Sequence, residues 1–469
     1  MFKIKPLVAA LLTVAATQAM AANNTSEQRQ NGFMNTAEVT QKLSNSNTAK
    51  QVQDGAKNFA DVTQTFGGSN IAEQLQSGGR NEATIYQALA LGSSATQHQD
   101  GDDNIAVTLQ VGTNGVEAVS NQEGNRNEAG VSQAFSANVR AIIDQYGDEN
   151  VAEIDQQLSS GSVANAKQDG NLNNASMSQS NSTSDRAMID QQGYKNDAGI
   201  FQAQSSDSAA EVEQIGSFND AYVSQTGSSQ QAYTYSGGSH NNLSVDQRGK
   251  RQTAFVYQLG NGNDATIAQK VGRDNTATTN QNGFSNEVTV GQAGSDQVAT
   301  VTQGGRENVA NVNQGGNDKN ATIDQEGFRN EAYVKQIGSH LNATIEQDGS
   351  LNLATVNQGG NGNSLTFDQS GVSNSLSAVQ EGEGNRITGT SNIAGNSVDI
   401  AQDGEFNLAN VDQFGFGNEA TLSQTDEKHE ANVTQFGTSH EALVSQSGYS
   451  NNALITQAGF NNMATVTQH

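Results

Sequence analysis

Residues of the same kind recur at every second position between regularly spaced turns of this chain. From Asn35 to Gln41 the alternate positions hold Asn, Ala, Val and Gln, with Thr, Glu and Thr between them, and residues 150–156 repeat this order with Ile in place of Val. A period of two places alternate side chains on opposite faces of an extended strand. The pattern therefore predicts β-strands with one nearly constant face and one variable face.

Glutamine marks the end of each predicted strand. Over residues 30–225 these marker glutamines are 11 and 12 residues apart in alternation, a period of 23, and over 281–380 and 402–468 the spacing is a uniform 11. Serine replaces the marker at Ser236 and Ser391. A disordered polar tract has no reason to hold such a register, so the spacing favours a folded repeat. The predicted row of stacked glutamines includes Gln30, Gln41, Gln53, Gln64, Gln145, Gln156, Gln303, Gln314, Gln325, Gln336, Gln347, Gln358 and Gln468.

Glycine and asparagine recur in the turns, two and five positions after a marker glutamine. Glycine adopts positive φ without steric cost, which suits it to a tight turn. In the first half every second turn lacks this glycine, carries a larger residue such as Leu43 or Phe66, and is one residue longer. Two strands per coil, joined by one tight and one looser turn, explain the alternating spacing. The turn glycines include Gly32, Gly55, Gly147, Gly327 and Gly349, and the asparagines include Asn35, Asn58, Asn150, Asn330 and Asn352.

One coil cannot be stable alone, because its few inward Val and Ile side chains contribute about 3–6 kcal/mol while ordering each residue costs about 1–2 kcal/mol. Stacking coils about 4.8 Å apart pairs every strand with its copies. It also places Gln on Gln and Asn on Asn, so each amide is expected to donate to one neighbour and accept from the other. The predicted fold is all-β: an amyloid-forming β-solenoid of about twenty strand-turn-strand coils in two parallel, in-register sheets.

The repeat divides the chain into segments that differ in period. Two stretches lose the marker glutamine and gain Gly and Ser, which predicts weaker coils or kinks at 226–242 and 381–401. The expected segments are a signal peptide at 1–21, a short N-terminal segment at 22–29, coils of period 23 at 30–225, and coils of mostly period 22 at 226–469.

The N-terminal sequence indicates that the chain is exported, and the overall composition disfavours several classes of partner. Lys3 and Lys5, the apolar run 7–16 and the small residues at 19–21 form the pattern of a secretory signal peptide. No later segment approaches the roughly 20 apolar residues of a transmembrane helix. A net charge of −26 disfavours nucleic acid and anionic lipid as partners, and the chain has no cysteine for a disulfide. The only proline is Pro6, as expected for strands that use every backbone donor.

Candidate chemical sites are few. His429 and His440 are the best candidates for a metal or catalytic role, but they occupy the Asn position 11 residues apart, which places them on opposite edges of a coil. The Gly-Asn runs at 260–264 and 359–363 are faintly similar to calcium-binding nonapeptide loops, which need a period of nine. Ice binding would require Thr pairs such as 465–467 to stack through successive coils. We expect no catalytic residue, no metal site and no cofactor.

The repeat resembles the curlin repeat of bacterial curli subunits, Ser-x5-Gln-x-Gly-x-x-Asn-x-Ala-x3-Gln. The stretches 53–64 and 145–156 match its Gln-to-Gln part fully, and the period of 23 with halves of 11 and 12 matches as well. The resemblance implies secretion through an outer-membrane channel, templated assembly into extracellular amyloid, and roles in adhesion and the biofilm matrix. The chain departs from the pattern in its many more repeats, in the period of 22 in its second half, and in Gln30, which opens a repeat where an export segment is expected.

The function expected is that of a structural, non-enzymatic subunit of cell-surface fibres that stack end to end. The last coil keeps the full pattern through Gln468, so we expect it to act as a template for the next molecule. The partners expected are further copies of the chain, a nucleator subunit, the secretion channel, and host or abiotic surfaces. The alternatives are a surface adhesin that does not polymerise and a nucleator-like minor subunit.

Overall fold

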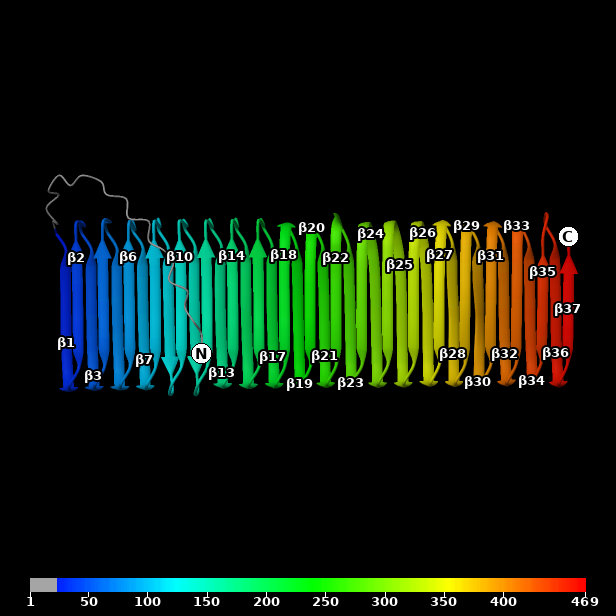
Figure 1. Cartoon of the computed structure of the whole chain (residues 1–469), viewed down its shortest axis with the longest axis horizontal. Helices are drawn as coiled ribbons and strands as arrows, with labels where there is room; N and C mark the ends of the chain where they lie inside the picture. The colour runs from blue at the N-terminus through cyan, green and yellow to red at the C-terminus, as the bar shows by residue number, and fades with distance from the viewer. Residues whose placement is uncertain (1–22) are drawn as a thin grey trace.

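The computed structural model describes residues 23–469, and this part of the chain forms a single long stack of parallel strands (Figure 1). Successive coils lie side by side, from the N-terminal coils at one end to the C-terminal coils at the other. The described residues contain no helix, as predicted for an all-β solenoid. The predicted signal peptide lies outside the described residues. Within 23–469 no helical segment has the length and hydrophobicity needed to cross a bilayer.

The strands form two faces of the solenoid. Face A consists of β1 (Thr25–Phe33), β3 (Thr48–Ala56), β5 (Ile71–Gly79), β7 (Ser94–Asp102), β9 (Glu117–Glu123), β11 (Arg140–Tyr146), β13 (Val163–Asn171), β15 (Arg186–Tyr194), β17 (Ala209–Ser217), β19 (Gln231–Ser239), β21 (Thr253–Asn261), β23 (Thr276–Phe284), β28 (Ser364–Val372), β30 (Arg386–Ala394), β32 (Leu408–Phe416), β34 (Glu430–Thr438) and β36 (Asn452–Phe460).

Face B consists of β2 (Thr36–Lys42), β4 (Phe59–Thr65), β6 (Glu82–Ala88), β8 (Ile105–Val111), β10 (Glu128–Ala134), β12 (Val151–Gln157), β14 (Asn174–Ser180), β16 (Asp197–Ala203), β18 (Asp220–Ser228), β20 (Asn242–Lys250), β22 (Asp264–Arg273), β27 (Leu353–Asn361), β29 (Ser375–Glu383), β31 (Ser397–Glu405), β33 (Glu419–Glu427), β35 (Glu441–Gln446) and β37 (Met463–Gln468). Three long strands, β24 (Glu287–Arg306), β25 (Val309–Phe328) and β26 (Glu331–Ser350), run along face B and then face A.

Each strand pairs in parallel with the strand one coil away, and equivalent residues of the repeat lie directly over one another. Gln145 pairs with Gln168, and Ala299 pairs with Ala321. The register matches the 22- and 23-residue spacing of the sequence, which confirms the predicted fold class. The register shifts near Val271, an extra residue before the turn glycine of β22 that is exposed as a bulge.

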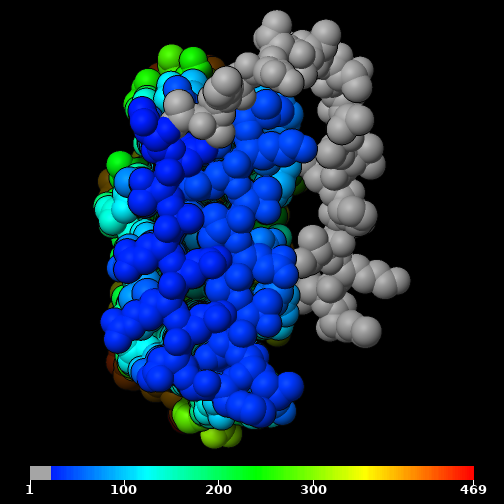
Figure 2. All heavy atoms as spheres, turned by 90° about the vertical axis from the view of Figure 1, so that its left-hand side faces the viewer, coloured from blue at the N-terminus to red at the C-terminus, as the bar shows by residue number. Residues whose placement is uncertain are grey.

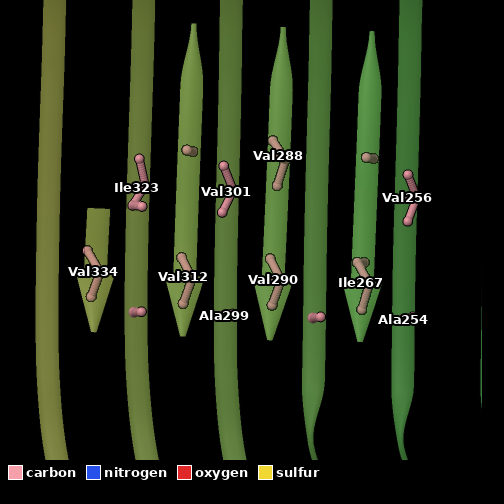
Figure 3. Packing of buried hydrophobic residues seen from close by; sticks show 14 of the residues in the cluster. Ala254, Val256, Ile267, Val288, Val290, Ala299, Val301, Val312, Ile323 and Val334 are labelled. Atoms are coloured by element: carbon pink, nitrogen blue, oxygen red, sulfur yellow. The ribbon is translucent and has the colours of Figure 1, made fainter. Parts of the chain in front are cut away.

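The core is a narrow layer between the two faces. Inward Ala, Val and Ile side chains fill it, as Figure 3 shows for Val301, Val312 and Ile323. The side chains between them point outward and are partly or fully exposed, so the predicted constant face is the buried one. Since each coil contributes so few apolar groups, burial depends on the neighbouring coils.

Two kinds of corner join the two faces. The first corner follows a face A strand, as in residues 32–35, and the second corner follows a face B strand, as in residues 43–47. In the first half the second corner is the looser one, and Leu43 and Ser46 both have positive φ there.

The strands continue through both stretches that lost the marker glutamine. β19 contains Ser236 and β30 contains Ser391, and each strand keeps its register with both neighbours. Neither stretch, 226–242 or 381–401, is therefore kinked at its serine, while the expected lower stability of these coils stays a prediction. Backbone pairing is sufficient to carry the chain past a missing side chain.

Candidate functional site

The marker glutamines of face B form one continuous chain of amide hydrogen bonds. Gln41 Nε2 donates to Gln64 Oε1 at 2.8 Å, and links of 2.7–2.9 Å continue coil by coil to Gln468. In every link the donor belongs to the coil nearer the N-terminus, so the ladder has a direction. Of the predicted residues, this ladder contains Gln41, Gln64, Gln156, Gln314, Gln336, Gln358 and Gln468.

The marker glutamines of face A form a similar ladder that is interrupted twice. It runs from Gln30 to Gln214, stops at Ser236, resumes from Gln258, stops again at Ser391 and then continues to Gln457. Each serine Oγ donates to the next glutamine at 3.3 Å. Both positions at which serine replaces the marker glutamine therefore lie on face A. The predicted residues in this ladder are Gln30, Gln53, Gln145, Gln303, Gln325 and Gln347.

From Gln41 onward, each marker glutamine amide also donates an N–H across the coil to the opposite face. Gln53 Nε2 donates to Thr36 O at 2.9 Å, and Gln145 Nε2 donates to Glu128 O at 3.0 Å. The same amide thus joins two coils along the axis and two faces across it. A buried amide that satisfies both donors and its acceptor avoids the desolvation cost that a polar core would otherwise carry.

The asparagines of the first corner bond backbone groups of the next coil, and in part of the row they also make the predicted amide-to-amide bonds. Asn58 accepts on Oδ1 from the backbone N–H of Asn81 at 3.0 Å, and its Nδ2 donates to the carbonyl of Gly78 at 3.0 Å. Asn35, Asn150, Asn330 and Asn352 make the same contact to the turn glycine of the next coil. Amide-to-amide bonds accompany these contacts in part of the row, as from Asn352 Nδ2 to Asn330 Oδ1 at 3.1 Å and from Asn173 Nδ2 to Asn150 Oδ1 at 3.2 Å. The asparagine side chain therefore bridges the turn glycine and the asparagine backbone N–H of the next coil and so holds that turn in shape.

The turn glycines meet both a conformational and a steric requirement. Gly55 has φ of 119° and Gly147 has φ of 103°, a region that side chains disfavour. A Cβ on Gly55 would also overlap the carbonyl oxygen of Gly78 in the next coil. The predicted turn residues Gly32, Gly327 and Gly349 have the same geometry. Close stacking of these turns therefore favours glycine on both counts.

His429 and His440 occupy the asparagine positions and take over the bonds of asparagine. Nδ1 of His429 accepts from the backbone N–H of Asn451 at 3.2 Å, and its Nε2 lies 2.7 Å from Thr425 O. His440 makes the equivalent contacts at 3.2 and 3.1 Å, in the other corner. Because Nδ1 accepts, the proton of each neutral ring sits on Nε2 and is donated to the carbonyl. Among residues 23–469 no three His, Cys, Asp or Glu side chains are grouped as metal ligands.

The second corner holds residues that the sequence reasoning missed. Its asparagine row is interrupted by Gln297, Lys319 and Leu341 in consecutive coils. Lys319 is only 2% exposed, and burial lowers the pKa of its ammonium group to about 8. Asp185 occupies the same row and is buried, which raises the pKa of its carboxyl. These substitutions would be visible in the sequence only after this second, less regular row had been aligned.

A third glutamine ladder, made of residues other than the markers, lies in the N-terminal coils and is buried from Gln51 onward. Gln28, Gln51, Gln74 and Gln97 replace the inward Val or Ile of face A and are linked at 2.8, 2.9 and 3.0 Å. The ladder ends where Gln97 donates to Thr108 at 3.1 Å. Their uniform spacing of 23 was a signal in the sequence that the marker pattern obscured.

Comparison with known proteins identifies the repeat. The family model for the curlin associated repeat matches residues 183–216, 205–233, 238–270, 272–305, 316–349, 342–371, 394–425 and 441–469, which together make up about half of the chain. These stretches lie in stacked coils of the solenoid. No curated protein matches the chain.

Proposed function

Because the chain belongs to the curlin associated repeat family, we propose that it is a structural subunit of extracellular, curli-like amyloid fibres. The subunits add head to tail, so that the last coil of one molecule pairs with the first described coil of the next. The role is structural and not enzymatic.

The direction of the glutamine ladders carries this proposal. At the C-terminal edge, Gln468 Nε2 donates to one backbone carbonyl of its own molecule and has a second N–H to offer, whereas Gln457 Nε2 donates to two backbone carbonyls and would exchange the bond to Asn462 O for a ladder bond. At the opposite edge, no described side chain donates to the Oε1 of Gln30 or Gln41. Donors at one edge and acceptors at the other favour head-to-tail contacts and disfavour contacts between like edges.

The register of the repeat supports the same junction. If β36 is followed by β1 and β37 by β2, Gln457 lies next to Gln30 and Gln468 next to Gln41. The exposed edge (Figure 2 shows the N-terminal one) would then be covered. Ala464 and Val466, half-buried at the C-terminal edge, would meet Ala37 and Val39. A sheet edge with unpaired backbone groups is a ready template for another strand.

One inward position does not match at this junction. Ile455 would meet Gln28, whose amide belongs to the N-terminal ladder. Burial of the Gln28 Oε1 against an apolar side chain is unfavourable. The junction is therefore weaker than a contact between two coils within the molecule.

The proposal includes where the fibre forms and what it contacts. Export of the chain through an outer-membrane channel, with a nucleator subunit to start assembly, would place the fibres on the cell surface. There they would serve adhesion to host or abiotic surfaces and contribute to the biofilm matrix. The support is membership of the family and a stack whose cohesion comes from repeated backbone and amide bonds.

Electron microscopy of the purified chain, followed over several days, tests the proposal. Unbranched fibres are expected, and diffraction from aligned fibres should give a meridional reflection near 4.8 Å. Persistent single rods of about 95 Å, from about twenty coils 4.8 Å apart, would contradict assembly and favour a surface adhesin that does not polymerise. Fibres that form only when pre-formed seeds are added would favour a subunit that depends on a nucleator.

A further inference from the structure

Four aromatic side chains gather on the outer side of face A. Tyr233 and Tyr235 project from β19, and Phe255 and Tyr257 project from the neighbouring β21, near the middle of the solenoid (Figure 1). The rings of Tyr233 and Phe255 are stacked with centroids 5.4 Å apart, and those of Tyr235 and Tyr257 are 4.8 Å apart. We call these four residues the aromatic patch.

Two carboxylates border the aromatic patch on one side. Glu211 pairs in register with Tyr233, and Glu213 pairs with Tyr235, both from β17. These side chains and the rings line a shallow cleft of about 370 Å³. On the other side β23 presents the uncharged Thr278 and Asn280. None of the four strands β17, β19, β21 and β23 carries a lysine or arginine. Arg186 of β15, the strand on the other side of β17, contacts Met188, and among the described residues neither Glu211 nor Glu213 has an ion-pair partner.

Elsewhere in the chain, an arginine binds a carboxylate and an aromatic ring that lie side by side in the same way. Nε of Arg329 donates to Glu307 of the neighbouring coil at 2.6 Å, and its guanidinium lies 4.7 Å from the centroid of the Phe328 ring. A planar guanidinium can stack on a ring and bond a carboxylate with the same group, which a lysine ammonium does less well. The aromatic patch offers the ring and the carboxylate without the cation.

We propose that the aromatic patch and its two glutamates bind an extended arginine-containing segment of another protein. Glu211 and Glu213 are two residues apart on one strand and face the same way, a separation of about 7 Å. Alternate residues of an extended peptide have the same spacing. An Arg-x-Arg segment lying along β17 can therefore place one guanidinium beside each carboxylate and against the rings of Tyr233 and Tyr235. The site is complete within one molecule and does not depend on fibre formation.

Binding of a fluorescent Gly-Arg-Ser-Arg-Gly peptide to the full chain, measured by anisotropy at about 0.1 M salt, tests the site. The lysine peptide Gly-Lys-Ser-Lys-Gly is the ligand control. Glu213→Gln and Tyr235→Thr are expected to weaken arginine-peptide binding by about three- to tenfold. Both variants are expected to fold, because Glu213 and Tyr235 point outward and other coils carry the small or uncharged residues Asn280 and Thr302 at the position of Tyr235.

Glu346→Gln, in the row of Glu213 but remote from the aromatic patch, and Tyr333→Thr, on face B, are matched control variants. They are expected to bind the arginine peptide like the unmodified chain. Equal binding of the two peptides, or equal losses in all four variants, would mean diffuse attraction to an acidic surface and would overturn the proposal. Absence of arginine-peptide binding to the unmodified chain would overturn it as well.

Discussion

The ammonium group of Lys319 donates to the carbonyl oxygen of Gly338 at 2.6 Å, in place of an asparagine amide. In the same row of the second corner, two coils away on either side, Asn275 and Asn363 make this bond with Nδ2 at 2.9 and 3.2 Å. The lysine therefore keeps the bond that closes the turn, but it brings a charge into a buried corner. Burial disfavours the charged form, which is why the pKa of Lys319 falls to about 8.

Lys319→Asn is expected to stabilise the coils around it, by an amount on the order of 3 kcal/mol at neutral pH. The folded-state pKa of about 8 lies below the ordinary value of 10.5, so the cost of the charge is fully present below pH 8 and is relieved as pH rises toward 10.5. The measurement is thermal unfolding of both chains between neutral and alkaline pH. A stability difference that does not narrow with rising pH would contradict this account.

Asp185→Asn tests the opposite dependence of stability on pH, a loss of stability as pH rises. Burial is the main cause that raises the pKa of Asp185, with a smaller contribution from Asp207, while bonds from Ser205 Oγ and the Ser208 N–H oppose the shift. The folded chain thus holds this proton more tightly than the unfolded chain, whose pKa is near 3.8. Stability should fall as pH rises from 3.8 through the folded-state pKa. The Asp185→Asn chain should not show this decrease in stability. The unfolding midpoints of both chains, measured across the acid pH range, test this.

Ile393→Gly should relieve backbone strain at the end of β30, where the chain enters the first corner. Ile393 has φ of 86° and lies between Gly371 and Gly415 in its row. A β-branched residue in this region costs about 1–2 kcal/mol, part of which the greater entropy of unfolded glycine offsets. We expect a net gain of about 1 kcal/mol. Ile337→Gly, at an outward position without positive φ, is the matched control and should not stabilise.

Gln325→Leu should open the solenoid locally. It removes the donor to Gln347 and leaves the Nε2 of Gln303 without its ladder partner. Each buried polar atom left unpaired costs about 1–3 kcal/mol. Since each coil contacts only its neighbours, the loss should appear as faster amide hydrogen exchange in β24, β25 and β26 and should fade within a few coils. Thr322→Ala, on the outer side of β25, should leave exchange unchanged.

Val466→Lys tests the head-to-tail junction. It places a charge on the inward side of β37, where the proposed contact would bury it. Seeded fibre growth, followed by light scattering, should slow by about tenfold or more, which corresponds to about 1.4 kcal/mol. Thr465→Lys adds the same charge on the exposed side of the strand and should grow at the unmodified rate. Equal growth of the two variants would exclude this edge from the junction.

Much of the architecture could be predicted from residue spacing alone. A marker every 11 or 12 residues, with alternation between markers, sets the strand positions, the buried face and the vertical neighbours, since a stacked repeat places equivalent residues together. That Gln145 lies next to Gln168 and Gly55 next to Gly78 in adjacent coils follows from counting.

Other features depended on how groups meet in three dimensions. Counting placed Asn58 under Asn81 but did not show that its amide bonds backbone groups of the next coil. Nor could it reveal the common direction of the ladders, which makes one edge a donor and the other an acceptor. The reason is physical: periodicity determines which residues are adjacent, whereas the direction of a hydrogen bond and the charge of a buried group depend on every partner within a few ångströms, including backbone atoms that are identical in every residue.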